Sequence, residues 1–198
     1  MILFLDRLPL SSWTDLTRTP PVRRWSVPLP VLLTEAGAAA PPPAGAVPQR
    51  WAFDTAFTGD AFAWRRHLEG AGLDPDVEQA PPVRFGSSLG ASALLPVRMA
   101  DLWLVSNVPA LRGRPFRLAL DPGVAFRNVP QRPDPEFHRP LVGIRPLLRA
   151  GLTVTIDFRA ATVSAWVPGP WYRSVALALR RILTGYATVP MPWSRHSM

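Results

Sequence analysis

The sequence contains no cysteine, which excludes disulfide bonds, a thiolate nucleophile and any cysteine-based metal site. Lysine is absent as well, so all 22 basic residues are arginine. Only three histidines occur, His67, His138 and His196, and they lie far apart without a His-x-x-x-His or His-Glu spacing. The sequence therefore predicts neither a zinc site nor another metal site, and no cofactor is expected.

Charged residues are scarce at 18%, yet the net charge is +8. A positive excess of this kind is typical of nucleic-acid-binding proteins, but here no run of five or six basic residues occurs. The aromatic residues lie inside apolar segments and do not alternate with arginines as a base-stacking surface would. Nucleic acid and membrane are therefore not the favoured partners. A β protein that binds nucleic acid or an anionic membrane through its arginines stays an alternative.

Long regular elements are also disfavoured, because 25 prolines are distributed through the apolar runs. With 198 residues, 47% of them hydrophobic, the chain is long enough for one well-buried core. These features predict a mostly β protein with short strands and many loops. The apolar start, Met1 to Leu5, is interrupted by Asp6 and has no positive segment before it. We expect neither a signal peptide nor a membrane span, and a cytoplasmic protein.

Several elements follow from local patterns. Arg24 to Thr34 is rich in β-forming residues and contains two prolines, which predicts an edge strand that forms a hairpin with the run ending at Asp54. The remaining expected elements are a hairpin around Gly86 to Gly90, a short helix between Gly143 and Gly151, a hairpin of residues 153–158 and 162–167, and an amphipathic helix from Trp171 to Tyr186. The last helix is basic, so binding to a membrane surface is a further use that the pattern allows.

The most informative stretch is residues 51–59, Trp-Ala-Phe-Asp-Thr-Ala-Phe-Thr-Gly, in which an apolar run ends at Asp54 and a turn is expected to follow. An aspartate at this place can simply hydrogen-bond its own turn, and the local sequence does not separate this reading from a functional one. Leu118 to Asp121 has a similar pattern, but Pro122 stands where Thr55 stands and supplies neither a hydroxyl nor a backbone donor. We therefore interpret Asp121 as a turn residue.

A second motif, Leu141-Val142-Gly143, precedes the short helix and the closing pair of strands. Together with Ala52-Phe53-Asp54-Thr55-Ala56-Phe57-Thr58-Gly59, it resembles the retropepsin-like aspartic proteases of the single-lobe type (clan AA). In that family an apolar strand ends in Asp-Thr/Ser-Gly, and a later apolar-apolar-Gly leads into a short helix. The resemblance extends over about residues 24 to 167.

The resemblance implies a fold and a division of the chain. The fold would be a mostly β single lobe of the acid-protease type, with closed, barrel-like sheets, a flap hairpin and short helices, plus the C-terminal amphipathic helix. Residues 1–23 would be an N-terminal extension, residues 24–168 the protease domain, and residues 169–198 the C-terminal helix and tail.

The resemblance also implies an aspartic endopeptidase that acts on a peptide or protein substrate. Two carboxyl groups at contact share one proton, so that one acts as a base on water while the other acts as an acid. Because the chain has one such motif, the second carboxyl would come from a homodimer. The implied catalytic residues are Asp54, Thr55 and Ala56. The implied substrate-binding residues are Phe57, Thr58 and the flap residues Gly86, Ser87, Ser88, Leu89 and Gly90. Leu141, Val142 and Gly143 would lie beside the site.

The motif departs from the family at one position, where Ala56 stands in place of glycine. Glycine permits unusual dihedral angles and a close approach to the backbone. The alternative to a peptidase is therefore the same fold without turnover, which would serve as a peptide-binding or interaction module. In either case we expect Asp54 to lie at the tip of a turn beside the Leu141-Val142-Gly143 strand, facing a groove.

Overall fold

The computed structural model describes residues 1–15, 19–43, 45–55, 57, 59–86, 92–128 and 139–169. Strands dominate this part of the chain, so the prediction of a mostly β protein is confirmed. The predicted helix from Trp171 to Tyr186 lies outside the described residues, as do Ala56, Thr58 and the loop residues Ser87, Ser88, Leu89 and Gly90.

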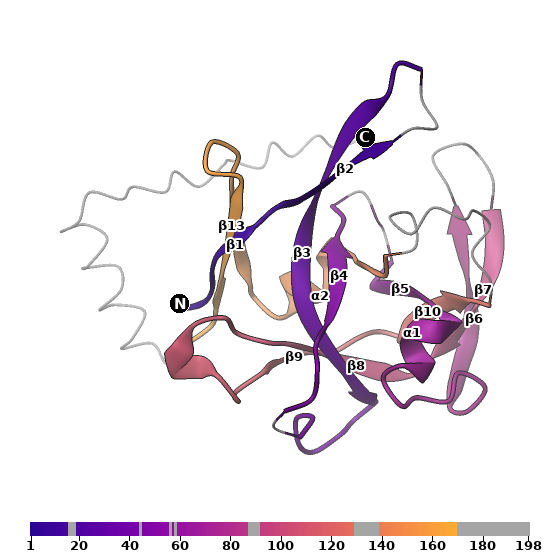
Figure 1. Cartoon of the computed structure of the whole chain (residues 1–198). Helices are drawn as coiled ribbons and strands as arrows, with labels where there is room; N and C mark the ends of the chain where they lie inside the picture. Colours follow the sequence, from indigo (N-terminus) through magenta and orange to yellow (C-terminus); the bar gives the residue numbers. More distant parts are fainter. Residues whose placement is uncertain are drawn as a thin grey trace, which may run out of the picture.

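The strands form two sheets (Figure 1). The smaller has the order β1-β13-β12 and consists of Ile2–Pro9, Thr162–Val167 and Thr153–Asp157. The larger has the order β6-β7-β10-β5-β11-β4-β3-β8-β9, and β2 (Ser11–Asp15) is paired with β3. Its other strands are β3 (Val22–Glu35), β4 (Gln49–Phe53), β5 (Ala61–Trp64), β6 (Gln79–Gly86), β7 (Ser92–Arg98), β8 (Ala100–Leu104), β9 (Phe116–Leu118), β10 (Val124–Arg127) and β11 (Leu141–Val142).

Helices are short: α1 (Arg65–Glu69), the 3-10 turn η1 (Pro109–Leu111) and α2 (Ile144–Arg149). The expected helix between Gly143 and Gly151 is confirmed in α2. Gly151 follows it with a φ of +66°, a left-handed conformation that glycine adopts without strain. The Leu152 N–H donates to the Leu147 carbonyl over 3.0 Å, which closes the end of the helix.

The expectation of closed, barrel-like sheets is wrong for the described residues. The larger sheet ends in β6 on one side and in β9 on the other, and these two strands do not pair with each other. The reason lies in the strand order, which puts the β6–β7 and β8–β9 hairpins at opposite ends. The β1-β13-β12 sheet is likewise open, and Figure 1 shows it on the opposite side of β3 from the β6–β7 hairpin.

The prediction of an edge strand at Arg24 to Thr34 is also wrong. The hairpin with β4 forms as expected, in a register that pairs Val27 with Phe53, but β3 also pairs with β8 and so lies inside the sheet. Proline has no backbone N–H to donate to a neighbouring strand. Pro28 and Pro30 are tolerated because their backbone nitrogens point away from β4, and because β8 pairs with β3 only from Val31 onward. The Pro30 carbonyl accepts a hydrogen bond from Val105, one residue beyond the end of β8.

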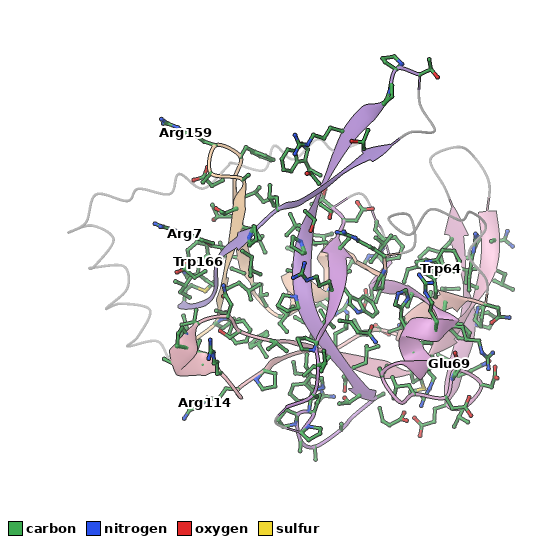
Figure 2. All side chains as sticks on the ribbon, in the orientation of Figure 1. Arg7, Trp64, Glu69, Arg114, Arg159 and Trp166 are labelled. Atoms are coloured by element: carbon green, nitrogen blue, oxygen red, sulfur yellow. The ribbon has the colours of Figure 1, made fainter. Side chains whose placement is uncertain are left out.

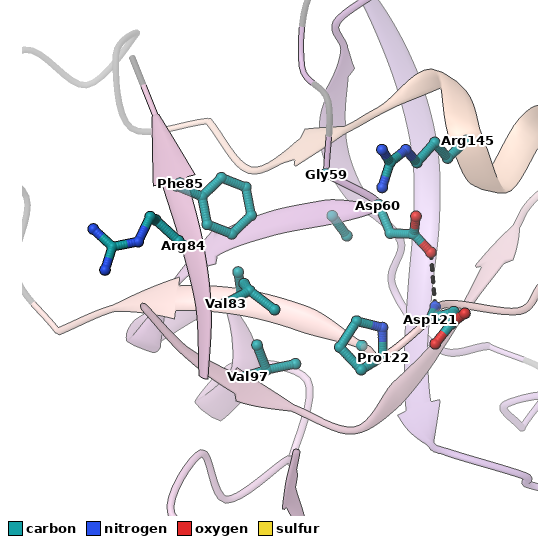
Figure 3. Close-up of a pocket in the computed structure, with 12 residues that line it drawn as sticks. Gly59, Asp60, Val83, Arg84, Phe85, Val97, Asp121, Pro122 and Arg145 are labelled. Carbon is teal, nitrogen blue, oxygen red and sulfur yellow. Dashed lines mark hydrogen bonds between the residues drawn. The ribbon is translucent and has the colours of Figure 1, made fainter. Parts of the chain in front are cut away.

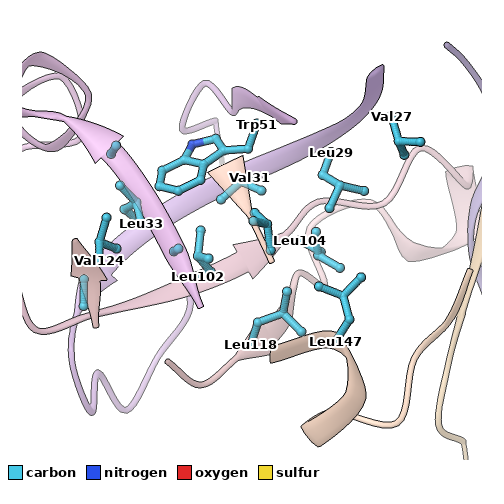
Figure 4. Close-up of a cluster of buried hydrophobic side chains, with 14 of the residues drawn as sticks. Val27, Leu29, Val31, Leu33, Trp51, Leu102, Leu104, Leu118, Val124 and Leu147 are labelled. Carbon is cyan, nitrogen blue, oxygen red and sulfur yellow. The ribbon is translucent and has the colours of Figure 1, made fainter. Parts of the chain in front are cut away.

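The main core lies between β3, β4, β8 and α2 (Figure 4). Burial alternates strictly along β3 from Val27 to Leu33, with Val27, Leu29, Val31 and Leu33 buried, as expected of a strand with one face on a core. Fully buried side chains that pack against them include Trp51, Leu102, Leu104 and Leu118. The first 23 residues contribute to this body, because β1 pairs with β13 along residues Ile2–Pro9 and its Phe4 and Leu5 are buried.

Candidate catalytic turn

Asp54 lies directly after β4, whose residues Trp51 and Ala52 are buried. The Asp54 side chain is half-buried and Thr55 is exposed. The Asp54 N–H donates to the Val142 carbonyl over 3.0 Å, and the Asp54 carbonyl accepts the Phe57 N–H over 3.3 Å. The partly buried strand β4 therefore leads into a turn in which backbone hydrogen bonds hold both the N–H and the carbonyl of Asp54.

The second motif lies beside the first. β11 is inserted between β4, to which it is parallel, and β5, to which it is antiparallel. Leu141 is opposite Ala52, and Val142 is opposite Phe53, the residue before Asp54. The predicted juxtaposition of Asp54 with Leu141-Val142-Gly143 is thus present. Two segments that are remote in sequence meet through backbone hydrogen bonds.

Gly143 makes the closest approach in the site. Its N–H donates to the Asp60 carbonyl over 2.8 Å. A Cβ atom here would lie 2.0 Å from the Gly59 carbonyl oxygen and 2.8 Å from that of Phe57. Its φ of −81° is open to any residue, so the requirement for glycine is one of space and not of dihedral angle. Gly143 therefore lets the helix start pack against the turn that holds Asp54.

Gly143→Ala is expected to destabilise the fold by about 2–3 kcal/mol, because the atoms that the new methyl group meets belong to the backbone and cannot rotate away. Gly37→Ala is the matched control. Gly37 has a φ of +74° and open space around its Cβ position, so only the dihedral cost of about 1 kcal/mol applies. Urea denaturation of both variants measures the difference. Equal losses of stability would contradict a steric role for Gly143.

The hairpin predicted around Gly86 to Gly90 is present in its two strands, β6 and β7, with Gly86 opposite Ser92. It contacts the candidate catalytic turn through aromatic side chains. Phe57 stacks on Phe85 of β6, with ring centroids 5.3 Å apart and planes inclined by 7°. Phe57, which the resemblance assigned to substrate binding, thus links the turn to the hairpin strand. Such a pair contributes about 0.5–1.5 kcal/mol beyond its area burial.

An ion pair that the sequence did not predict supports the same region. The buried Asp60 carboxylate accepts hydrogen bonds from both terminal nitrogens of Arg149 on α2, and from the Asp121 N–H over 2.7 Å. Hydrogen bonding to this carboxylate raises the pKa of Arg149 above its ordinary value. Asp60 thereby joins the start of β5, the end of α2 and the Asp121 turn. Asp121 itself is exposed and lies in a bend, as its interpretation as a turn residue requires.

A cavity of about 230 Å³ opens beside this ion pair (Figure 3). Its apolar lining comes from Ala61, Val83, Phe85, Val97, Pro122 and Ala125. Its charged lining comes from Asp60, Arg84, Asp121 and Arg145. Asp54 is not among the lining residues, but Gly59, which closes the Asp54 turn, is. The cavity therefore adjoins the turn on the side of the β6–β7 hairpin.

Comparisons of the chain with protein-family models, with curated proteins and with solved structures gave no significant match. In the described ranges, no group of three or more histidine, aspartate or glutamate side chains is arranged to hold a metal ion. No helix in the same ranges has the length and apolar character needed to cross a membrane.

Proposed function

We propose that the chain is a retropepsin-like aspartic endopeptidase that acts as a homodimer, with Asp54 of each copy forming the catalytic pair. The observation that carries the proposal is the hydrogen bond from the Asp54 N–H to the Val142 carbonyl. Through it, an aspartate at the end of a buried strand is held beside an apolar-apolar-Gly motif.

The chemistry requires two carboxyl groups, and the chain offers one such turn. A two-fold axis near Asp54 would bring its twin to contact, and the exposed Thr55 would hydrogen-bond across that axis. At contact, the two carboxyl groups share one proton, since ionising both is unfavourable.

Hydrolysis follows from this shared proton. The ionised carboxylate removes a proton from water, whose oxygen attacks the peptide carbonyl carbon, while the protonated carboxyl donates to the carbonyl oxygen. A proton is then returned to the leaving nitrogen as the C–N bond breaks, which yields a carboxylic acid and an amine. The half-buried position of Asp54 favours such a pair, because a partly excluded solvent strengthens the interaction between the two groups.

The β6–β7 hairpin would act as the flap. It approaches the turn through the Phe57–Phe85 stack, and an extended peptide between hairpin and turn could add backbone hydrogen bonds in the manner of a strand. Closing the hairpin over the peptide would exclude water from the reacting atoms. The substrate is therefore proposed to be an extended segment of a peptide or protein.

A second candidate is a peptide-binding module of the same architecture without turnover. Ala56 favours this second candidate, because the residue after Thr55 is alanine here, whereas it is glycine in the family. A displacement of about 1 Å at the reacting groups can lower a rate by about 10²-fold. This candidate shares every binding feature with the first and differs only in whether the peptide bond is broken.

The test is a peptidase assay of the full chain between pH 3 and pH 7, with mass spectrometry of the products from an unfolded protein substrate. We expect cleavage at acidic pH that pepstatin inhibits, since this compound mimics the tetrahedral intermediate of aspartic proteases. Ala56→Gly is expected to increase the rate. Absence of cleavage in both the wild type and Ala56→Gly would reject the peptidase and leave the binding module.

A further inference from the structure

The cavity beside the candidate catalytic turn combines apolar side chains with Arg145, an arginine that has no partner among the described residues. In Figure 3 the side chains of Val83, Phe85 and Pro122 converge on the cavity, and Arg145 lies at its rim above Asp60. The Arg145 side chain is exposed, and it makes no ion pair or side-chain hydrogen bond within the part of the chain that is described. A cation is thus available at the mouth of a hollow that is lined by both apolar and charged side chains.

The other charged groups of the cavity do not neutralise Arg145. Asp60 is buried and already paired with both terminal nitrogens of Arg149. Asp121 lies at the end of the cavity beyond Pro122, and its charge contributes to the raised pKa of Arg149. Arg84 extends away from the other side chains in Figure 3. Among the described charged groups of the cavity, Arg145 is therefore the cation that remains available to a negatively charged ligand.

The place of the cavity relates it to a bound peptide. Gly59 and Ala61, which follow the Asp54 turn, form one wall, and Phe85 of the β6 strand forms another. Phe85 also stacks on Phe57, so the cavity begins where turn and hairpin meet. A side chain of an extended peptide that runs between turn and hairpin would project into it, since alternate side chains point to the same face.

We propose that this cavity is a specificity pocket for a glutamate side chain of the bound peptide, with Arg145 as the residue that recognises the carboxylate; this inference rests on the proposed function. A glutamate side chain that enters beside Phe85 would pack its two methylene groups against Phe85 and Val83, and its carboxylate would extend toward Arg145. Arginine presents two parallel N–H donors that match a carboxylate, which favours it over a neutral amide of the same shape.

The experiment selects peptides by binding, so that it does not depend on turnover. The full-length Asp54→Asn protein is immobilised and exposed to a mixture of decapeptides with randomised positions, all amidated at the C-terminus so that any carboxylate belongs to a side chain. Retained peptides are sequenced by mass spectrometry. We expect glutamate to be enriched about two- to fivefold over glutamine at one position, the range for an exposed charge pair.

Two further variants make the assignment specific. Adding Arg145→Glu should abolish the glutamate enrichment and replace it with lysine or arginine, whereas adding Arg159→Glu should leave it unchanged. Arg159 is exposed and lies on the β12–β13 turn, far from the cavity (Figure 2), so both variants change the net charge equally. Peptides retained without a preference for glutamate, no retained peptides, or equal effects of the two variants would overturn the inference.

Cleavage of the same peptide mixture by the wild-type protein separates this inference from the proposed function. Cleavage without a glutamate preference would support the peptidase and overturn the pocket assignment. Glutamate-dependent retention without cleavage would support the pocket and reject turnover, in favour of the binding module. Cleavage with glutamate at a fixed distance from the broken bond is the result that we expect.

Discussion

Asp54→Asn is expected to lower kcat/KM for peptide hydrolysis by about 10²–10⁴-fold, the usual contribution of a positioned acid–base group. Asparagine has nearly the same shape and keeps the backbone N–H that donates to Val142, so the turn should stay folded. It cannot, however, take a proton from water or share one with a twin carboxyl group. The measurement is the initial rate of cleavage at the pH of maximal activity.

Asp157→Asn is the matched control for this variant. Asp157 also ends a strand, β12, but it is exposed and does not line the cavity, and its carboxylate accepts a hydrogen bond from the Ala160 N–H over 2.9 Å. We expect its replacement to change kcat/KM less than twofold, because the group takes no part in the chemistry. A rate that Asp54→Asn leaves unchanged, or one that both variants lower equally, would exclude Asp54 as the catalytic group.

Arg98→Ala is expected to reduce the free energy of unfolding by about 3–4 kcal/mol, because a buried, multiply bonded cation is removed. The Arg98 side chain is only 1% exposed. Its Nε donates to the Asp74 carbonyl and one Nη to the Met99 carbonyl, each over 2.8 Å. Its two terminal nitrogens also pair with Glu78 and Glu35. One side chain thus joins β7, the end of β3 and the loop before β6.

The loss should come mainly from the two backbone carbonyls and from the vacated volume. Glu35 and Glu78 are 51% and 55% exposed, so water can replace the arginine at their carboxylates. Arg98→Lys should fall between the wild type and the alanine variant, since an ammonium group keeps the charge but cannot span the same acceptors. Denaturation in urea measures the free energy of unfolding of the wild type, Arg98→Ala and Arg98→Lys.

Arg65→Ala is the surface counterpart. Arg65 pairs with Glu69 and Asp76 near the surface, and those pairs are screened by solvent. We expect its loss to change stability far less than that of Arg98. If the two alanine variants are equally stable, the buried network around Arg98 does not contribute to the fold as described.

Local patterns in the sequence predicted the elements that depend on neighbouring residues. The β3–β4 hairpin, the short helix before Gly151 and the hairpin of β12 and β13 all form as expected. The turn at Asp54 and the strand Leu141–Val142 were also placed side by side, and here the resemblance to a known family supplied the long-range relation that no local pattern contains.

Features that depend on the global strand order were not predictable in the same way. Two prolines indicated that β3 would be an edge strand, and only the register shows that β8 ends before it reaches them. Asp60 and Arg149 are 89 positions apart, and no local sequence pattern around either residue predicts that they form an ion pair. Arg98 was likewise one arginine among 22, and its burial follows from the meeting of three separate segments.

The chemistry proposed for Asp54 requires two copies of the chain, and subunit mixing tests this directly. Wild-type and Asp54→Asn chains are refolded together in equal amounts at a constant total concentration, with exchange verified by capture of an affinity tag on one of them. If each active site needs an aspartate from both copies, random pairing leaves about one quarter of the dimers with two aspartates, and activity should fall to about that fraction. Activity that falls only to one half, in proportion to the wild-type chains present, would contradict a shared pair of carboxyl groups.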